Sequence, residues 1–230
     1  MTERITAAVP DREALPRPPL NLDASMPQTF LFLAFVAIFV GYFMVWLPHE
    51  TAGLSFTGLE MGEQAKFLPP VREGQIVPGR SLFYVPPITL ALMLVLLAAR
   101  WPNRRWQTWA ARALAVALSF LAFPALEALG TEAAEWLWRV LMIVLVVLTA
   151  VATSVAGQRL SSRALWLLFL LVALAGAILP TWAFQAVRPL FASLLQAEIG
   201  IGPGVWLNGV GHATAAVIAA IGFARVQDQG

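Results

Sequence analysis

Long apolar stretches that alternate with short polar segments constrain this chain more than any other feature of its sequence. Of its 230 residues, 59% are hydrophobic and only 12% are charged, whereas soluble domains carry about 25% charged residues. So few charges cannot cover a surface that faces water. The chain is therefore predicted to be an integral membrane protein, in which each span needs about 20 apolar residues to cross the hydrocarbon layer.

We predict an all-α fold, a polytopic transmembrane bundle of about six helices. The predicted spans are 27–47, 84–100, 108–129, 135–156, 164–187 and 205–224. Pro86 and Pro87 suit the start of the second span, because first-turn N–H groups have no partner within a helix. Pro124 and Pro180 are predicted to kink the third and fifth spans. The domains expected are a flexible tail over 1–25, the bundle over 26–225 and a C-terminal tail over 226–230.

Basic residues are distributed unevenly between the two sides of this predicted bundle. Ten of the 15 lysines and arginines fall on one side: Arg4, Arg12, Arg17, Arg100, Arg104, Arg105, Arg112, Arg159, Arg163 and Arg225. Cytoplasmic loops of membrane proteins carry an excess of Lys and Arg. We therefore expect a multi-pass protein of a cell membrane, of the bacterial inner-membrane type, with both termini in the cytoplasm.

The polar segment 47–83 between the first two spans is predicted to form an ordered external cap. Thr57 and Glu60 match the capping-box pattern, in which each side chain accepts from the other's backbone N–H. A short helix over 58–68 would follow and lie at the membrane interface, where Glu63 and Lys66 are close enough to attract. The prolines at 69 and 70 would end it. The alternative is a solvated linker.

Polar side chains in the predicted spans gather near the external side. They are Glu127, Arg139, Gln185, Asn208 and His212. Ionisable residues inside a membrane are expensive and therefore mark candidate sites. Because the inner halves of the spans are almost wholly apolar, we expect an outward-facing polar pocket or docking surface rather than a channel through the full depth.

Each of these groups also has a structural interpretation. Arg139 could pair with Glu135 one helical turn away, or with Glu127, and so fasten two helices. Asn208 and His212 lie one turn apart on the last helix, whose small residues favour close helix packing. His212 could be hydrogen-bonded inside the bundle, or it could contact a ligand or accept a proton.

Several chemistries are excluded or disfavoured. The chain has no cysteine and only two histidines, and the histidine spacing fits no zinc motif. The glycines between 200 and 204 lack the strand and lysine of a phosphate-binding loop. A net charge of +2 without a basic face gives no sign of nucleic-acid binding. We therefore predict no metal, no cofactor and no nucleic-acid partner.

The function expected is that of a non-enzymatic accessory or scaffold subunit of a membrane complex. Its partners would be the lipid bilayer and other membrane subunits, or a second copy bound through the last helix. The alternative is a transporter or binding protein for a small molecule or lipid, with an outward-open cavity. An intramembrane enzyme using Glu127 or His212 as a general base is the third option, although no nucleophile or metal accompanies either residue.

Overall fold

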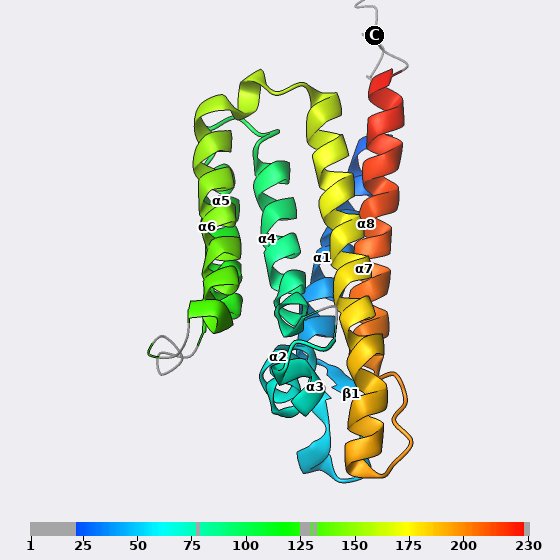
Figure 1. The fold of residues 1–230 in the computed structure, drawn as a ribbon. Helices are drawn as coiled ribbons and strands as arrows, with labels where there is room; N and C mark the ends of the chain where they lie inside the picture. The colour runs from blue at the N-terminus through cyan, green and yellow to red at the C-terminus, as the bar shows by residue number, and fades with distance from the viewer. Residues whose placement is uncertain (1–21, 77–78, 125–129, 131–132, 228–230) are drawn as a thin grey trace, which may run out of the picture.

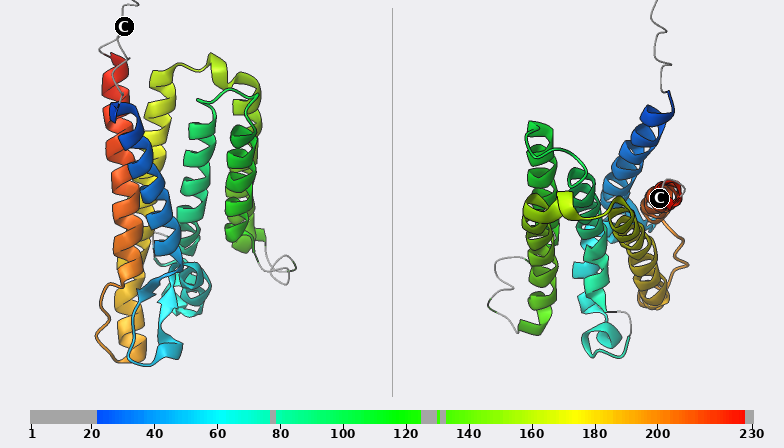
Figure 2. Two further views of the ribbon diagram at one scale, coloured as in Figure 1. Left: turned by 180° about the vertical axis from the view of Figure 1, so that it is seen from behind. Right: turned by 90° about the horizontal axis from the view of Figure 1, so that it is seen from above.

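Six long helices of the described chain run side by side and alternate in direction (Figure 1). The computed structural model describes residues 22–76, 79–124, 130 and 133–227. The long helices are α1 (Leu22–Phe43), α4 (Val85–Ala98), α5 (Trp106–Ser119), α6 (Ala133–Ala156), α7 (Ser162–Leu195) and α8 (Pro203–Gln227). α8 packs against α1 and α7, while α4 contacts α7, α5, α6 and α1. The α5–α6 pair and α8 therefore lie on opposite sides of α4 (Figure 2).

Four segments of the described chain are long and apolar enough to cross a membrane, by length and composition. They are Arg80–Ala98, Trp136–Ala156, Ser162–Leu195 and Pro203–Val226, and a shorter apolar helix covers Gln28–Phe43. These helices suggest a membrane protein. The predicted span 108–129 is shorter than expected, because α5 ends at Ser119 and a 3-10 turn follows over Phe120–Ala122. Phe123 is extended, as the residue before a proline prefers to be.

Local sequence signals explain where several helices begin. The prolines at 86 and 87 lie in the first turn of α4, as predicted. Ser161 caps α7 by accepting a hydrogen bond from the backbone N–H of Ala164 at 3.1 Å. α7 continues through Pro180 and Pro189 to Leu195, so it is the longest helix of the described chain.

The segment between α1 and α4 forms a compact cap at one end of the bundle, beside the last turns of α7 (Figure 1). It contains strands β1 (Val45–Leu47) and β2 (Phe56–Thr57), which pair antiparallel, then helices α2 (Gly58–Gln64) and α3 (Pro69–Arg72). The 3-10 turns are η1 (Ala52–Leu54), η2 (Ala65–Phe67) and η3 (Arg80–Tyr84). The capping box at Thr57 and Glu60 is confirmed. The two strands were not predicted, and the prolines at 69 and 70 begin a new helix as well as ending the previous turn.

The opposite end of the bundle carries most of the described arginines, and we call it the basic end. It holds Arg100, Arg104, Arg105, Arg159, Arg163 and Arg225, which lie beyond the end of α4, before the starts of α5 and α7, in the first turn of α7, or near the end of α8. The end that carries the cap is called the cap end. The ribbon places the end of α8 and the start of α7 together at the basic end (Figure 1).

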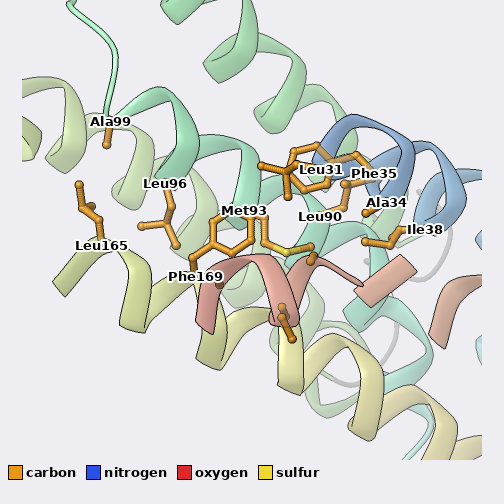
Figure 3. Close-up of a cluster of buried hydrophobic side chains, with 14 residues drawn as sticks. Leu31, Ala34, Phe35, Ile38, Leu90, Met93, Leu96, Ala99, Leu165 and Phe169 are labelled. Carbon is orange, nitrogen blue, oxygen red and sulfur yellow. The ribbon is translucent and has the colours of Figure 1, made fainter. Parts of the chain in front are cut away.

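Buried apolar side chains fill the bundle in layers. The cluster in Figure 3 joins α1, α4, α7 and α8 through Phe35, Met93 and Phe169, among others. A second cluster lies under the cap, where the Trp46 ring contacts Phe83 and Phe184 edge-on. The Trp46 indole N–H donates to the carbonyl of Gly41 at 2.8 Å. The cap is therefore packed onto the bundle rather than tethered loosely to it.

Glycines allow α1 and α8 to approach closely. A Cβ atom at Gly41 would lie 2.5 Å from the backbone nitrogen of Asn208, and one at Gly211 would lie 2.8 Å from the carbonyl of Ala34. Close approach of backbones through small residues is the usual way in which helices associate within membranes. The small residues of α8 are thus used largely inside this chain, against α1.

Gly41→Ala is expected to destabilise the protein by about 1–3 kcal/mol, because the new methyl group meets backbone that cannot rotate away. The matched control is Gly209→Ala, since a Cβ at Gly209 has nothing within 4 Å. That control should be neutral or stabilise by up to about 1 kcal/mol, because alanine favours a helix. Reversible unfolding in detergent measures both variants, and equal effects would contradict the close α1–α8 contact.

Candidate functional site

Arg139 donates three hydrogen bonds at the cap end of the bundle. It lies on α6, is only 6% exposed, and its Nη1 donates to Oε1 of Glu63 at 2.6 Å. Its Nε and Nη2 donate to the carbonyls of Ala122 and Phe123 at 2.8 and 2.9 Å. One guanidinium group therefore ties α6 both to the turn that follows α5 and to helix α2 of the cap.

Glu63 receives hydrogen bonds from three side chains. Besides Arg139, the Tyr84 hydroxyl donates to Oε1 at 2.6 Å, and Lys66 Nζ donates to Oε2 at 3.2 Å. The Arg139 guanidinium also lies over the Tyr84 ring, 3.8 Å from its centroid. Burial raises the pKa of the Glu63 carboxyl, but hydrogen bonds from Tyr84 and Arg139 and the charge of Arg139 outweigh it and lower the pKa to about 2.

We name Arg139, Glu63, Tyr84 and Lys66 the cap cluster. It gathers groups from α6, α2, η3 and η2, which come from distant parts of the sequence. Both carboxylate oxygens of Glu63 already accept hydrogen bonds, and the guanidinium donates in three directions. The arrangement is suited to holding the cap in a fixed position rather than to proton transfer.

Glu63→Gln is expected to loosen the cap. Amide exchange over residues 58–67 should become about tenfold faster, since a hydrogen bond to a charged group contributes about 1.5–3 kcal/mol and the partial exposure of Glu63 reduces that value. Lys66→Gln is the matched control, because its ion pair with the same carboxylate is more exposed. Its effect should stay below about threefold. Equal acceleration by both variants would contradict a dominant role for Arg139.

Because Glu63 must be ionised to pair with Arg139, the stability of the cap is expected to depend on pH. The folded-state pKa of Glu63, about 2, lies below the ordinary value of 4.5, so the ionised carboxylate stabilises the fold. This contribution is fully present above the ordinary pKa and is lost as the pH falls toward the folded value. The difference in amide exchange between the wild type and Glu63→Gln should be constant from neutral pH to about pH 5 and shrink below it. A difference that is unchanged at pH 3 (about one unit above the folded value) relative to pH 7 would argue against ionisation of Glu63 as its cause.

His212 and Asn208 lie in the interior, where both are 0% exposed. The Nδ1 atom of His212 lies 3.0 Å from the backbone carbonyl of Asn208. Its Nε2 atom lies 2.9 Å from Oγ1 of Thr89 on α4. A carbonyl oxygen only accepts, so Nδ1 carries a proton and donates. In the neutral ring, Nε2 is then the acceptor and the Thr89 hydroxyl donates to it.

The Thr89 hydroxyl can also rotate to a different partner. Its oxygen lies 3.0 Å from the carbonyls of Val85 and Pro86. If the ring were doubly protonated, Nε2 would donate to Thr89, and the hydroxyl would donate to one of these carbonyls. Gly176 on α7 makes space for this contact, because a Cβ there would overlap the His212 ring and the Thr89 hydroxyl. The histidine thus joins α4, α7 and α8.

Asn208 differs from its neighbour on α8. Its side-chain nitrogen and oxygen are buried and have no hydrogen-bond partner within the described chain. The same holds for the Tyr42 hydroxyl on α1. An unpartnered amide is costly in an apolar interior. The backbone of the same residue, Asn208, makes the close contact between α8 and Gly41 of α1.

Thr89→Val is expected to destabilise the protein by about 0.6–1.7 kcal/mol, the range measured for hydrogen bonds between membrane helices. The loss arises because Nε2 of His212 keeps no partner while the shape of residue 89 is preserved. Thr149→Val on α6 is the matched control, since that hydroxyl bonds only to the carbonyl of Leu145 one turn earlier. Reversible unfolding in detergent should show little change for the control. Equal costs would contradict an interhelical role for Thr89.

The structure does not bring the five predicted pocket residues together. Arg139 belongs to the cap cluster, Asn208 and His212 lie between helices, and Gln185 is exposed on α7. Glu127 and the side chain of Glu135 lie outside the described residues. Glu63 was predicted only as a cap residue beside Lys66, an attraction that is confirmed.

Tyr84, Thr89 and Gly176 were missed by the sequence analysis. A usable signal existed for the first two, because Tyr84 is one of only two tyrosines and Thr89 interrupts an apolar run. Gly176 gave no such signal, since glycine is common in membrane helices.

A cavity with a volume of about 990 Å³ lies at the basic end, away from the predicted pocket residues. Within the described residues, no group of three or more His, Asp or Glu side chains is placed to hold a metal ion. A scan against protein-family models, a search of curated proteins and a search of solved structures each gave no match.

Proposed function

We propose that this protein is a non-enzymatic integral membrane protein that serves as an accessory or scaffold subunit, with the cap as its docking surface. The observation that carries the proposal is the cap cluster. The strongest polar groups at this end, Arg139 and Glu63, are used to fix α2 onto the bundle. A fixed external element is what a docking surface needs, because ordering a flexible one on binding costs free energy.

The proposed topology has all six long helices crossing a bacterial inner membrane, with the basic end in the cytoplasm. Support comes from the gathering of described arginines at the end opposite the cap and from the excess of Lys and Arg in cytoplasmic loops generally. The cap would then lie on the external side, with helix α2 near the membrane interface. Both termini would be cytoplasmic.

The cap offers a surface with the character of a protein interface. Phe67 is 68% exposed, and the Lys66 ammonium lies 5.2 Å from the centroid of its ring. The exposed charges of Glu60, Arg72 and Glu73 lie on the same cap. An exposed aromatic residue among polar neighbours is a common centre of binding energy at interfaces.

The competing hypotheses have weaker support. An outward-open cavity lined by Arg139, Asn208 and His212 would leave these groups free, whereas Arg139 and His212 are engaged in packing between helices. For catalysis, His212 would have to reach a substrate, and it is fully buried. Association of two copies through α8 would compete with the use of its glycines against α1.

Phe67→Glu is expected to remove the partner without unfolding the protein. Wild-type protein extracted from native membranes in mild detergent should migrate on a native gel as a complex with a second subunit in fixed ratio, and the variant should migrate alone. Thr51→Glu adds the same charge at another exposed position of the cap and should keep the complex. If the wild type is recovered as a lone monomer, the proposal fails; if Phe67 only touches lipid, all three proteins will migrate alike.

A further inference from the structure

The cavity at the basic end is a groove between four parts of the chain. Its walls come from the start of α1, the end of α4 with the residues just after it, the start of α7 and one face of α8. Its volume of about 990 Å³ is at the upper end of the range for small-molecule sites, about 300–1,000 Å³. Seen from above, α1 is inclined to α8 and its start leans away from it (Figure 2).

The length of the groove is lined mainly by apolar side chains. On α8 they follow a helical stripe through Val210, Ala213, Val217 and Ile221. From residue 210 to residue 226 the helix rises about 24 Å, which exceeds the depth of one leaflet, about 15 Å of hydrocarbon. A groove of this length and character matches an extended hydrocarbon chain.

The end of the groove is basic and aromatic. Arg100 and Arg225 line it together with Trp101 and Trp166. The Arg100 guanidinium lies 4.2 Å from the centroid of the Trp166 ring, and Gly222 leaves the space that this ring occupies, because a Cβ there would overlap it. The Trp166 ring is thus packed between Arg100 and Gly222, so this wall of the groove is ordered by specific contacts.

Among the described residues of the groove, the two arginines have no acidic counterpart. None of the residues that line it is an aspartate or glutamate, and within the described chain the ion pairs found lie at Glu63 in the cap. Trp side chains prefer the headgroup level of a membrane, and basic residues next to a membrane attract anionic lipids. The positive charge at one end of the groove and the apolar lining of the rest are thus complementary to an amphiphile with an anionic headgroup and an apolar tail.

We propose that this groove binds one phospholipid with a net negative headgroup. The headgroup lies at Arg100 and Arg225, and an acyl chain follows the apolar stripe of α8. The chain's own residues 1–21 are a poorer match for the groove, because their sequence mixes acidic and basic side chains with several prolines and has no long apolar run. A partner helix would fit the stripe but would leave the two arginines without an anion.

Native mass spectrometry of the full chain in detergent tests the proposal with phosphatidylglycerol and phosphatidylcholine as probes. One phosphatidylglycerol molecule should be retained in preference to phosphatidylcholine. The double variant Arg100→Gln/Arg225→Gln should lower this preference about fivefold for each arginine, the value expected for a basic residue near anionic lipid. The matched double variant Arg104→Gln/Arg159→Gln, at the same end but outside the groove, should keep it.

A second variant tests the apolar wall independently. Ala213 is exposed and lines the groove, so Ala213→Trp should fill it without disturbing the packed core and should abolish retention of both lipids. Thermal unfolding of each variant establishes that it is folded. Equal retention of the two lipids by the wild type, retention of neither, or equal loss in the two double variants would each overturn the proposal.

Discussion

The pairing of Arg139 with Glu63 is the interaction on which the cap end of this protein depends. A guanidinium that is almost wholly buried requires partners for its donors. It finds them in a carboxylate of the cap and in two carbonyls at the end of α5. Those carbonyls are left free because α5 ends there in a 3-10 turn before Pro124. One side chain thus joins the turn that follows α5 to the cap.

Close contacts at glycines hold together the other half of the bundle, which consists of α1, α4, α7 and α8. Glycines at 41, 204 and 211 bring α1 and α8 into contact, and Gly176 admits the His212 ring between α7 and α4. As a result, the helices pack around two separate apolar clusters. α1, α4, α7 and α8 share one apolar core (Figure 3), whereas α5 and α6 pack on the other side of α4 through a separate cluster.

Much of the local structure could be predicted from the sequence, because its signals act over a few residues. The capping box at Thr57 and the proline start of α4 are of this kind. The partner of Arg139 could not be found in this way. Spacing within a helix favoured Glu135, but the described partner is Glu63, 76 residues away. Pairings between distant segments depend on how helices pack, which periodicity does not report.

The location of the groove escaped prediction for a related reason. In a sequence, polar side chains within apolar spans mark candidate sites, and here these side chains lie toward the cap end. The groove is instead made of apolar residues and of arginines that were counted only as topology signals. Its existence depends on the inclination of α1 relative to α8, which no pattern in either helix specifies.

The contact between α1 and α8 also has a consequence for biosynthesis. These two helices share the most extensive interface of the described chain, yet α8 is synthesised after all the other described helices. Until then α1 lacks its main neighbour, and the backbone around Gly41 is without its contact to α8. Completion of the fold is therefore a late event that joins the two ends of the described sequence, and ribosomes that stop before residue 203 would release a bundle without its closing helix.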